Sequence, residues 1–312
     1  MRTHVSPDHQ VHKAPIRNGD VDWDSFDTAT YIADNYAELH SADREIISRL
    51  SGFYRELPPG SVQRSLELGA GPNLYPLMLA GCVSRHIEVV ERSAANVTHL
   101  RNVFSQDPPP EHWQPFWRLS RELNPALPQD LRSVLDRVVC RQGNAFDLEP
   151  GLYGLGSMFF VAESVTSDEN EFRTMCCRFV ESVRPGGYVV AAFMAGMSEY
   201  GVAEEVLPSY PLSEDRLADV FGAYTERLQI RKIPPDASLP YQYDGMLLMT
   251  GHRSEYRGYW RHEESALTPP VVERRHNSRV ALNGQRPGPD LTTHRKPTLA
   301  ITEASDPGSP LP

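Results

Sequence analysis

Hydrophobic residues follow two alternating patterns along most of the chain. Short apolar runs have the length of buried strands, and they lie at residues 65–70, 86–92, 137–144, 157–162 and 188–194. Between them, apolar residues recur at the three- and four-residue steps typical of helices, at 72–81, 93–104 and 169–183. Two late apolar runs predict further strands, at 228–233 and 245–252. Strands that alternate with helices predict an α/β fold, a mostly parallel sheet with helices on both faces.

The remaining segments divide the chain into four parts. Residues 1–20 are rich in histidine, proline and charge, and we expect them to be disordered. Residues 21–60 are mostly helical in pattern, and we expect them to form a helical lid over the ends of the strands. The main α/β domain covers 61–253, with an insertion at 105–137 that predicts one or two extra helices. Residues 254–312 are rich in proline and poor in apolar periodicity, which predicts a mostly disordered tail.

Composition disfavours several classes of protein. The 312 residues are 40% hydrophobic, and their net charge of −10 argues against a nucleic-acid partner, which clustered lysine and arginine would attract. No apolar run approaches the ~20 residues of a membrane span, and the polar N-terminus does not resemble a secretion signal. Four cysteines form no disulfide ladder and no paired metal motif. We expect a cytoplasmic protein, a monomer or weak homodimer, with no metal ion and no membrane partner.

The first strand leads into an unusual glycine turn within LELGAGPNLYPL, residues 66–77. Gly69, Ala70 and Gly71 resemble the start of a phosphate-binding loop, where missing side chains let a ligand lie against the backbone. A dinucleotide-binding turn would have a third glycine three positions later, and this chain lacks it. Pro72 also removes a backbone N–H that a pyrophosphate would need. Taken alone, the two glycines fit an ordinary βα turn equally well.

Two other strand ends indicate which ligand this turn would bind. Glu91 ends the second strand, 20 residues after Gly71, a spacing typical of an acid that accepts hydrogen bonds from ribose hydroxyls. Asn144 and Ala145 follow the third strand, where an adenine ring would lie, and Glu67 precedes the turn within reach of a ligand amine. A ligand with adenine, ribose and an ammonium group but no phosphate is S-adenosylmethionine. We predict it as the cofactor.

These stretches resemble class I S-adenosylmethionine-dependent methyltransferases, and more narrowly the nicotinamide, phenylethanolamine and indolethylamine N-methyltransferase family. YIADNYAELHSADREI (31–46) is similar to that family's N-terminal lid with its paired tyrosines, and GAGPNLY has its unusual proline and tyrosine. VVERSAANV has the acid followed five positions later by asparagine. The resemblance covers Trp23 to Arg253, including VESVRPGGYVVAAFM. It implies a Rossmann-like, seven-stranded, mostly parallel sheet, with 61–253 as the methyltransferase domain.

The resemblance also implies a set of cofactor-binding positions. Tyr31 and Tyr36 correspond to the family's tyrosines that close over the cofactor, although packing within the helical core would also explain these two residues. The set is Tyr31, Tyr36, Gly69, Ala70, Gly71, Asn73, Tyr75, Glu91, Asn96, Asn144 and Ala145. One member, Asn144, departs from the family, which often has aspartate at that corner.

The acceptor side departs further from the family. N-methylating members have polar or acidic residues after the fifth strand, whereas this chain has AAFMAGMSEYGVAEE, in which one phenylalanine and two methionines replace them. Glu163, Glu199 and Tyr200 are the catalytic candidates for positioning the acceptor or accepting a proton, and each also fits a surface role. The pattern favours a flat, weakly polar substrate, a small aromatic or amine-bearing molecule of secondary metabolism. N-methylation is favoured, and C-methylation of an indole-like ring stays open.

Two functions of other classes stay open from the sequence. The first is a nicotinamide-dependent oxidoreductase, which the missing third glycine and Pro72 argue against. The second is a non-catalytic protein with a cofactor-binding fold, whose tail would recruit a partner.

Overall fold

The computed structural model describes residues 14–255, and all of them belong to one compact unit. The predicted tail at 254–312 lies almost entirely outside the described residues. Within the described range, no helix combines the length and the apolar character needed to cross a bilayer.

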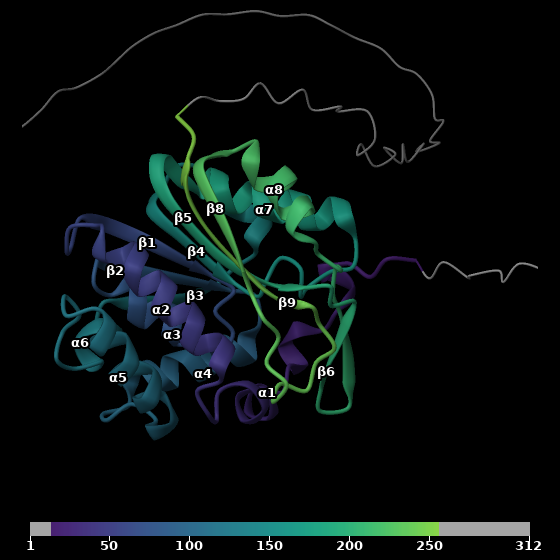
Figure 1. The fold of residues 1–312 in the computed structure, drawn as a ribbon. Coiled ribbons are helices and arrows are strands. Elements are labelled where there is room, and N and C mark those ends of the chain that lie inside the picture. The colour runs from purple at the N-terminus through teal and green to yellow at the C-terminus, as the bar shows by residue number, and fades with distance from the viewer. Residues whose placement is uncertain (1–13, 256–312) are drawn as a thin grey trace, which may run out of the picture. The chain divides into compact units, whose positions relative to one another are not determined.

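A seven-stranded sheet forms the centre of this unit (Figure 1). In spatial order, its strands are β3 (Val138–Gln142), β2 (Ser84–Glu91), β1 (Val62–Leu68), β4 (Tyr153–Phe159), β5 (Val183–Ala195), β9 (Gly245–Arg253) and β8 (Thr225–Ile233). The first five pair in parallel, and β9 runs antiparallel to both β5 and β8. This confirms the predicted Rossmann-like, mostly parallel sheet. The strand order reverses between β1 and β4, which opens a ligand crevice at their carboxyl ends.

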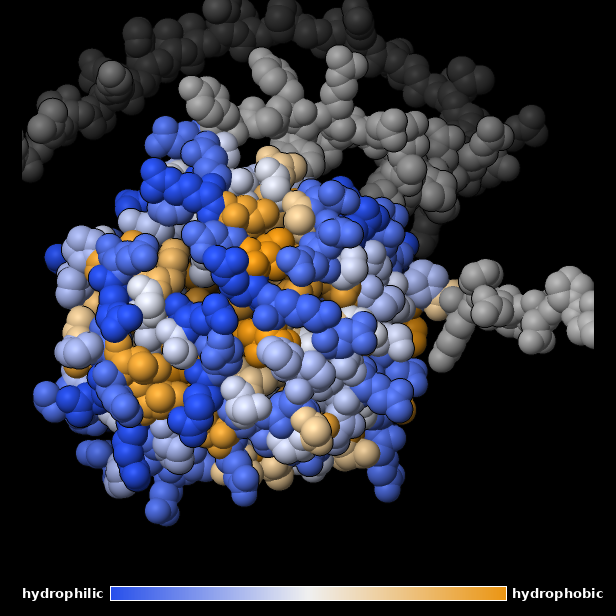
Figure 2. All heavy atoms as spheres, in the orientation of Figure 1, coloured by the Kyte–Doolittle hydropathy of each residue, from blue (hydrophilic) through white to orange (hydrophobic). Residues whose placement is uncertain are grey.

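Helices cover both faces of the sheet. One apolar core includes residues of α2 (Ser41–Arg55), α3 (Tyr75–Ala80), α4 (Ala94–Ser105) and α5 (Gln114–Leu123), and the other includes residues of α7 (Glu169–Ser182) and α8 (Glu214–Gly222). Phe116 on α5 and Phe179 on α7 have no exposed surface, so both cores are closed to water. The outside is largely polar: Figure 2 shows hydrophilic residues over most of one face, with apolar residues in smaller areas between them.

Side-chain caps explain where two of these helices begin. Ser93 Oγ accepts a hydrogen bond from Asn96 N (3.1 Å) at the start of α4, and Asp168 Oδ1 accepts one from Glu171 N (2.9 Å) at the start of α7. Each cap satisfies a backbone N–H that has no partner within its helix. The capped start of α4 follows the carboxyl end of β2 directly, whereas residues 160–168 connect β4 to α7.

Two further segments lie outside the central sheet. The insertion at 105–137 contains a 3₁₀ turn (Glu111–Trp113), α5 and the short α6 (Arg132–Leu135). A small hairpin of β6 (Glu199–Val202) and β7 (Glu205–Pro208) follows β5. The pattern did not predict this hairpin, because its strands are only four residues long and each has two exposed residues.

The prediction of disorder through residue 20 is wrong for residues 14–20. Ile16 N donates to Ser167 Oγ (2.8 Å), and Asn18 N donates to Glu171 Oε2 (2.8 Å). A short 3₁₀ turn, Asn18–Asp20, follows. These hydrogen bonds join residues about 150 positions apart, so no local pattern could have indicated them.

The expected lid at 21–60 divides into two parts. A 3₁₀ turn (Trp23–Ser25) and α1 (Thr28–Asn35) line a cavity at the strand ends, whereas α2 reaches the cavity only with its first turn and otherwise packs into the core. Ile46, Ile47 and Leu50 of α2 have 0% exposure. We therefore treat α2 as scaffold, and call residues 16–36 the N-terminal strap.

Candidate active site

The cavity lies where the carboxyl ends of β1, β2, β3, β4 and β5 meet. It is lined mainly by apolar and aromatic side chains with a few polar groups, the usual composition of a small-molecule site. Its walls come from the strand ends, the N-terminal strap, the first turn of α2 and the segment 239–246 that leads into β9.

The glycine turn after β1 brings bare backbone to the cavity wall. Gly69 and Gly71 have φ of +62° and +54°, a left-handed conformation that favours glycine. A Cβ at Gly69 would lie 2.7 Å from Val161 Cγ1, so no side chain fits there. Gly71 is open by comparison, because the nearest atom to its Cβ would be Asn96 Nδ2 at 4.0 Å.

Glu91 holds this turn from the neighbouring strand. Its Oε2 accepts from Gly71 N and its Oε1 from Ser93 N, both at 2.8 Å. Burial raises the pKa of Glu91, and these backbone hydrogen bonds partly offset the rise. A carboxylate has about four lone-pair positions, so both oxygens can still accept hydrogen bonds from ligand hydroxyls in the cavity.

Asparagines shape two further stretches of wall. Asn144 Oδ1 accepts from Phe146 N (3.2 Å), and this fixes the corner that presents Ala145. Asn96 Oδ1 accepts from Thr28 Oγ1 (2.8 Å), which ties α4 to the N-terminal strap. Every predicted cofactor-binding residue except Tyr75 lines the cavity.

A match to a family sequence model identifies the protein family of this chain. The model of the NNMT/PNMT/TEMT family matches residues 17–250, well over half of the chain. The chain belongs to the NNMT/PNMT/TEMT family. The family consists of S-adenosylmethionine-dependent methyltransferases, so S-adenosylmethionine is the cofactor, and nothing supports the nicotinamide alternative.

Solved structures of similar fold include other methyltransferases. The N-methyltransferase NodS from Bradyrhizobium japonicum WM9, in complex with S-adenosyl-L-homocysteine, is 12% identical, with 74% of this chain and 94% of that chain covered and a TM-score of 0.46. A putative S-adenosylmethionine-dependent methyltransferase from Listeria monocytogenes is 12% identical (67% and 99% covered, TM-score 0.44). The glycopeptide N-methyltransferase MtfA with sinefungin is 15% identical (66% and 92% covered, TM-score 0.41). Among curated proteins, the chain has no match.

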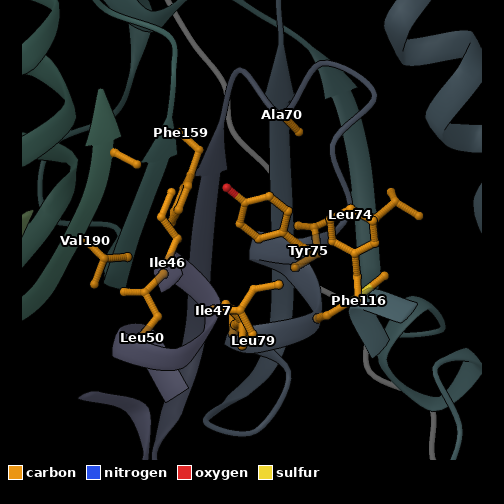
Figure 3. Packing of buried hydrophobic residues seen from close by; sticks show 14 of the residues in the cluster. Ile46, Ile47, Leu50, Ala70, Leu74, Tyr75, Leu79, Phe116, Phe159 and Val190 are labelled. Atoms are coloured by element: carbon orange, nitrogen blue, oxygen red, sulfur yellow. The ribbon is translucent and has the colours of Figure 1, made fainter. Parts of the chain in front are cut away.

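Three tyrosines of this methyltransferase form a cluster beside the cavity, and two of them, Tyr31 and Tyr36, line it. The ring centroids of Tyr31 and Tyr36 are 5.9 Å apart, and those of Tyr36 and Tyr75 are 6.4 Å apart. Tyr75 is fully buried, and its ring stacks on Phe116 and meets Phe159 edge-on (Figure 3). Burial raises the pKa of all three tyrosines, so their hydroxyls stay protonated and can donate.

The three catalytic candidates of the methyltransferase lie in different places. Tyr200 lines the cavity, and its hydroxyl donates to the Ser164 carbonyl (3.0 Å). Burial raises its pKa well above the usual value, which makes it a poor proton acceptor. Glu199 is exposed on β6 and is not part of the cavity wall.

Glu163 lies behind the cavity wall, not in it. It has no exposed surface, its Oε1 accepts from Met194 N (2.8 Å), and its Oε2 has no hydrogen-bond partner. Burial raises its pKa to about 8, so the carboxyl is mostly protonated at neutral pH. In this position it holds the end of β5, from which Met194 reaches the cavity.

Asn35, Asp43 and Tyr241 are among the polar residues of the wall that sequence reasoning missed. Asn35 Nδ2 donates to Tyr241 Oη (2.7 Å), which joins α1 to the loop before β9. Asp43, in the first turn of α2, is only 4% exposed. Its signal was present in the sequence: Asp43 lies three positions before Ile46, on the same face of the helix as the apolar residues. Nothing local indicated Asn35 or Tyr241.

Proposed function

We propose that the protein transfers the methyl group of S-adenosylmethionine to a nitrogen atom of a small, flat, weakly polar molecule. The observation that carries this proposal is the composition of the cavity wall beyond the glycine turn. Aromatic and thioether side chains dominate that part, namely Phe160, Met194, Met197, Tyr200, Tyr241 and Met246. Thioethers and aromatic rings pack well on an aromatic ring and offer few hydrogen bonds to a sugar or a peptide.

The two ligands would occupy opposite halves of the cavity. The predicted cofactor residues follow β1, β2 and β3, whereas Met194 and Met197 follow β5 and Met246 lies in β9. These strands lie on either side of the β1–β4 reversal, so the two halves meet there. The cofactor positions named from the sequence remain part of this proposal.

The bound cofactor supplies a methyl group on a positively charged sulfonium sulfur. A nitrogen lone pair attacks in line, the C–S bond breaks as the N–C bond forms, and a proton leaves the product if the acceptor was an amine. The protein mainly orients the acceptor and excludes water. Tyr200 and Tyr241 can position an acceptor, whereas we assign Glu199 no role in the step and Glu163 a supporting one.

The N-terminal strap closes one side of the site. Thr28 contacts α4, and Asp24 Oδ1 accepts from Ala94 N (2.7 Å) at the start of the same helix. Arg17 pairs with Asp168 at the start of α7 (3.4 Å). The strap is therefore fastened on both sides of the cavity.

The function is tested by incubating the full chain with methyl-labelled S-adenosylmethionine and a cell lysate separated by molecular size. We expect label in the small-molecule fraction, and fragmentation spectra should place it on nitrogen. Glu91→Ala should abolish the signal, whereas Glu88→Gln is the matched control. Glu88 is an acid of the same strand, but it pairs with Arg64 and Arg141 and does not line the cavity. Label that enters only protein or nucleic acid would contradict the proposal.

A further inference from the structure

Two buried polar side chains in the cavity wall lack a partner among the described residues: Asp43 has no ion pair, and Asn73 has an unused hydrogen-bond donor. Asp43 is 4% exposed and forms no ion pair among residues 14–255. Asn73 is also 4% exposed: its Oδ1 accepts from Tyr75 N (3.1 Å), but its Nδ2 has no hydrogen-bond partner. Both residues line the cavity. One is an acceptor that lacks a cation, and the other is a donor that lacks an acceptor.

Tyr75 brings these two groups into one cluster. Its hydroxyl lies near the side chains of both Asp43 and Asn73. It forms a well-aligned hydrogen bond with neither of them. Figure 3 shows the Tyr75 ring fixed between core side chains, with its hydroxyl oxygen on the side that faces Phe159. Tyr75 begins α3, only four residues after Gly71, so the cluster continues the wall that starts with the glycine turn.

A role in helix stability alone does not explain Asp43. An acid in the first turn favours a helix, but it does so equally well at an exposed position. The start of α2 is already held by Asp236, whose Oδ2 accepts from Ser41 N (2.7 Å). A carboxylate that is buried without a cation destabilises the free protein. Its place in the wall is understandable if a ligand supplies the cation.

The rest of the wall indicates which cation this is. Two acids line the described wall, Glu91 at the end of β2 and Asp43 in the first turn of α2. A ligand whose ribose meets Glu91 and whose chain passes Gly69 and Gly71 would place its other end at this cluster. For S-adenosylmethionine that end is an amino acid, with one ammonium and one carboxylate.

We propose that Asp43 binds the α-ammonium group of the cofactor's methionyl end, while Asn73 Nδ2 donates to its α-carboxylate. This inference rests on the proposed placement of the cofactor in this cavity. It assigns Asp43 to cofactor binding and leaves the acceptor to the aromatic and methionine wall. The cofactor's ammonium group then pairs with the Asp43 carboxylate, and its carboxylate accepts the hydrogen bond that Asn73 Nδ2 can donate.

Calorimetry with two ligands tests this assignment. One ligand is S-adenosylhomocysteine, and the other is its analogue in which hydrogen replaces the α-ammonium group. The wild-type protein should bind the analogue at least about tenfold more weakly, the loss expected for a hydrogen bond between charged groups. Asp43→Asn should bind S-adenosylhomocysteine more weakly and discriminate between the two ligands by less than about threefold. Glu45→Gln is the matched control, because Glu45 lies on the same helix and pairs with Arg49 outside the cavity.

Each result bears on the proposal. If Asp43→Asn discriminates as strongly as the wild type, the ammonium is bound elsewhere and the proposal is wrong. If the wild type binds both ligands equally, the proposal also fails, while cofactor binding and the proposed function stand. If the wild type binds neither ligand, the cofactor placement itself fails. Asp43→Ser serves as a second variant should Asp43→Asn not fold.

Discussion

Glu67 should make the stability of this protein fall as the pH rises. The residue lies in β1 just before the glycine turn, is 1% exposed, and neither of its carboxyl oxygens has a hydrogen-bond partner. Burial raises its pKa from 4.5 to about 8, and the nearby Ser157 lowers it only in part. Between these two pH values the folded chain holds a proton that the unfolded chain has lost. Stability therefore decreases as the pH rises through this window.

The size of the effect follows from this shift. Each pH unit between the two pKa values changes the free energy of unfolding by at most about 1.4 kcal/mol. From pH 5 to pH 8 the upper bound is roughly 4 kcal/mol, and we expect about 2 kcal/mol because water entry and relaxation reduce it. Glu67→Gln removes the titration but keeps the shape of the protonated side chain.

Urea unfolding at pH 5, 6, 7 and 8 measures this effect. The free energy of unfolding of Glu67→Gln minus that of the wild type should increase by about 2 kcal/mol across the series. Other buried acids, such as Asp43 and Glu163, are present in both proteins and cancel. The exposed Glu38 provides the matched carboxyl-to-amide control, Glu38→Gln, measured in the same series. A flat difference for Glu67→Gln would falsify the reasoning that Glu67 is protonated in the folded protein.

Four further predictions concern the site. Glu91→Ala should weaken S-adenosylhomocysteine binding at least about tenfold in calorimetry, through lost charge-assisted hydrogen bonds and a loosened glycine turn; unchanged affinity would overturn the assignment. Gly69→Ala should lower the melting temperature more than Gly71→Ala, because both positions have positive φ but only the first would place a Cβ against Val161; equal losses would refute the steric argument. Tyr36→Phe should weaken cofactor binding by about 0.5–1.5 kcal/mol, whereas a lower melting temperature with unchanged affinity would mark Tyr36 as a core residue only. Ser167→Ala removes the acceptor of Ile16 N (2.8 Å) and should speed amide exchange in the N-terminal strap, while added S-adenosylhomocysteine should slow it; exchange that is equally slow in all cases would show that the strap does not open.

The sequence by itself determined the parallel sheet, the glycine turn and the acid that faces it. Strand and helix periodicities are local, so the hydrophobic pattern marked every strand of the central sheet and most of its helices. Gly69, Gly71 and Glu91 were identifiable because their spacing reflects one strand, one turn and the next strand. Such spacing is set by the length of a βα unit, so it can be recognised in the sequence without information on distant contacts.

Only the tertiary structure decided which side chains meet in the cavity. Asn35 and Tyr241 are 206 positions apart and share a hydrogen bond. Glu163 follows β4 as expected, but its side chain accepts a hydrogen bond from Met194 N and lies behind the wall, and the hairpin leaves Glu199 in solvent. The helical pattern placed Asp43 on the apolar face of its helix. Its burial, however, depends on the cavity formed by the strap, the sheet and the loop before β9. The burial of a side chain and its hydrogen-bond partners depend on all the residues that surround it. These residues come together only when segments distant in sequence pack against one another.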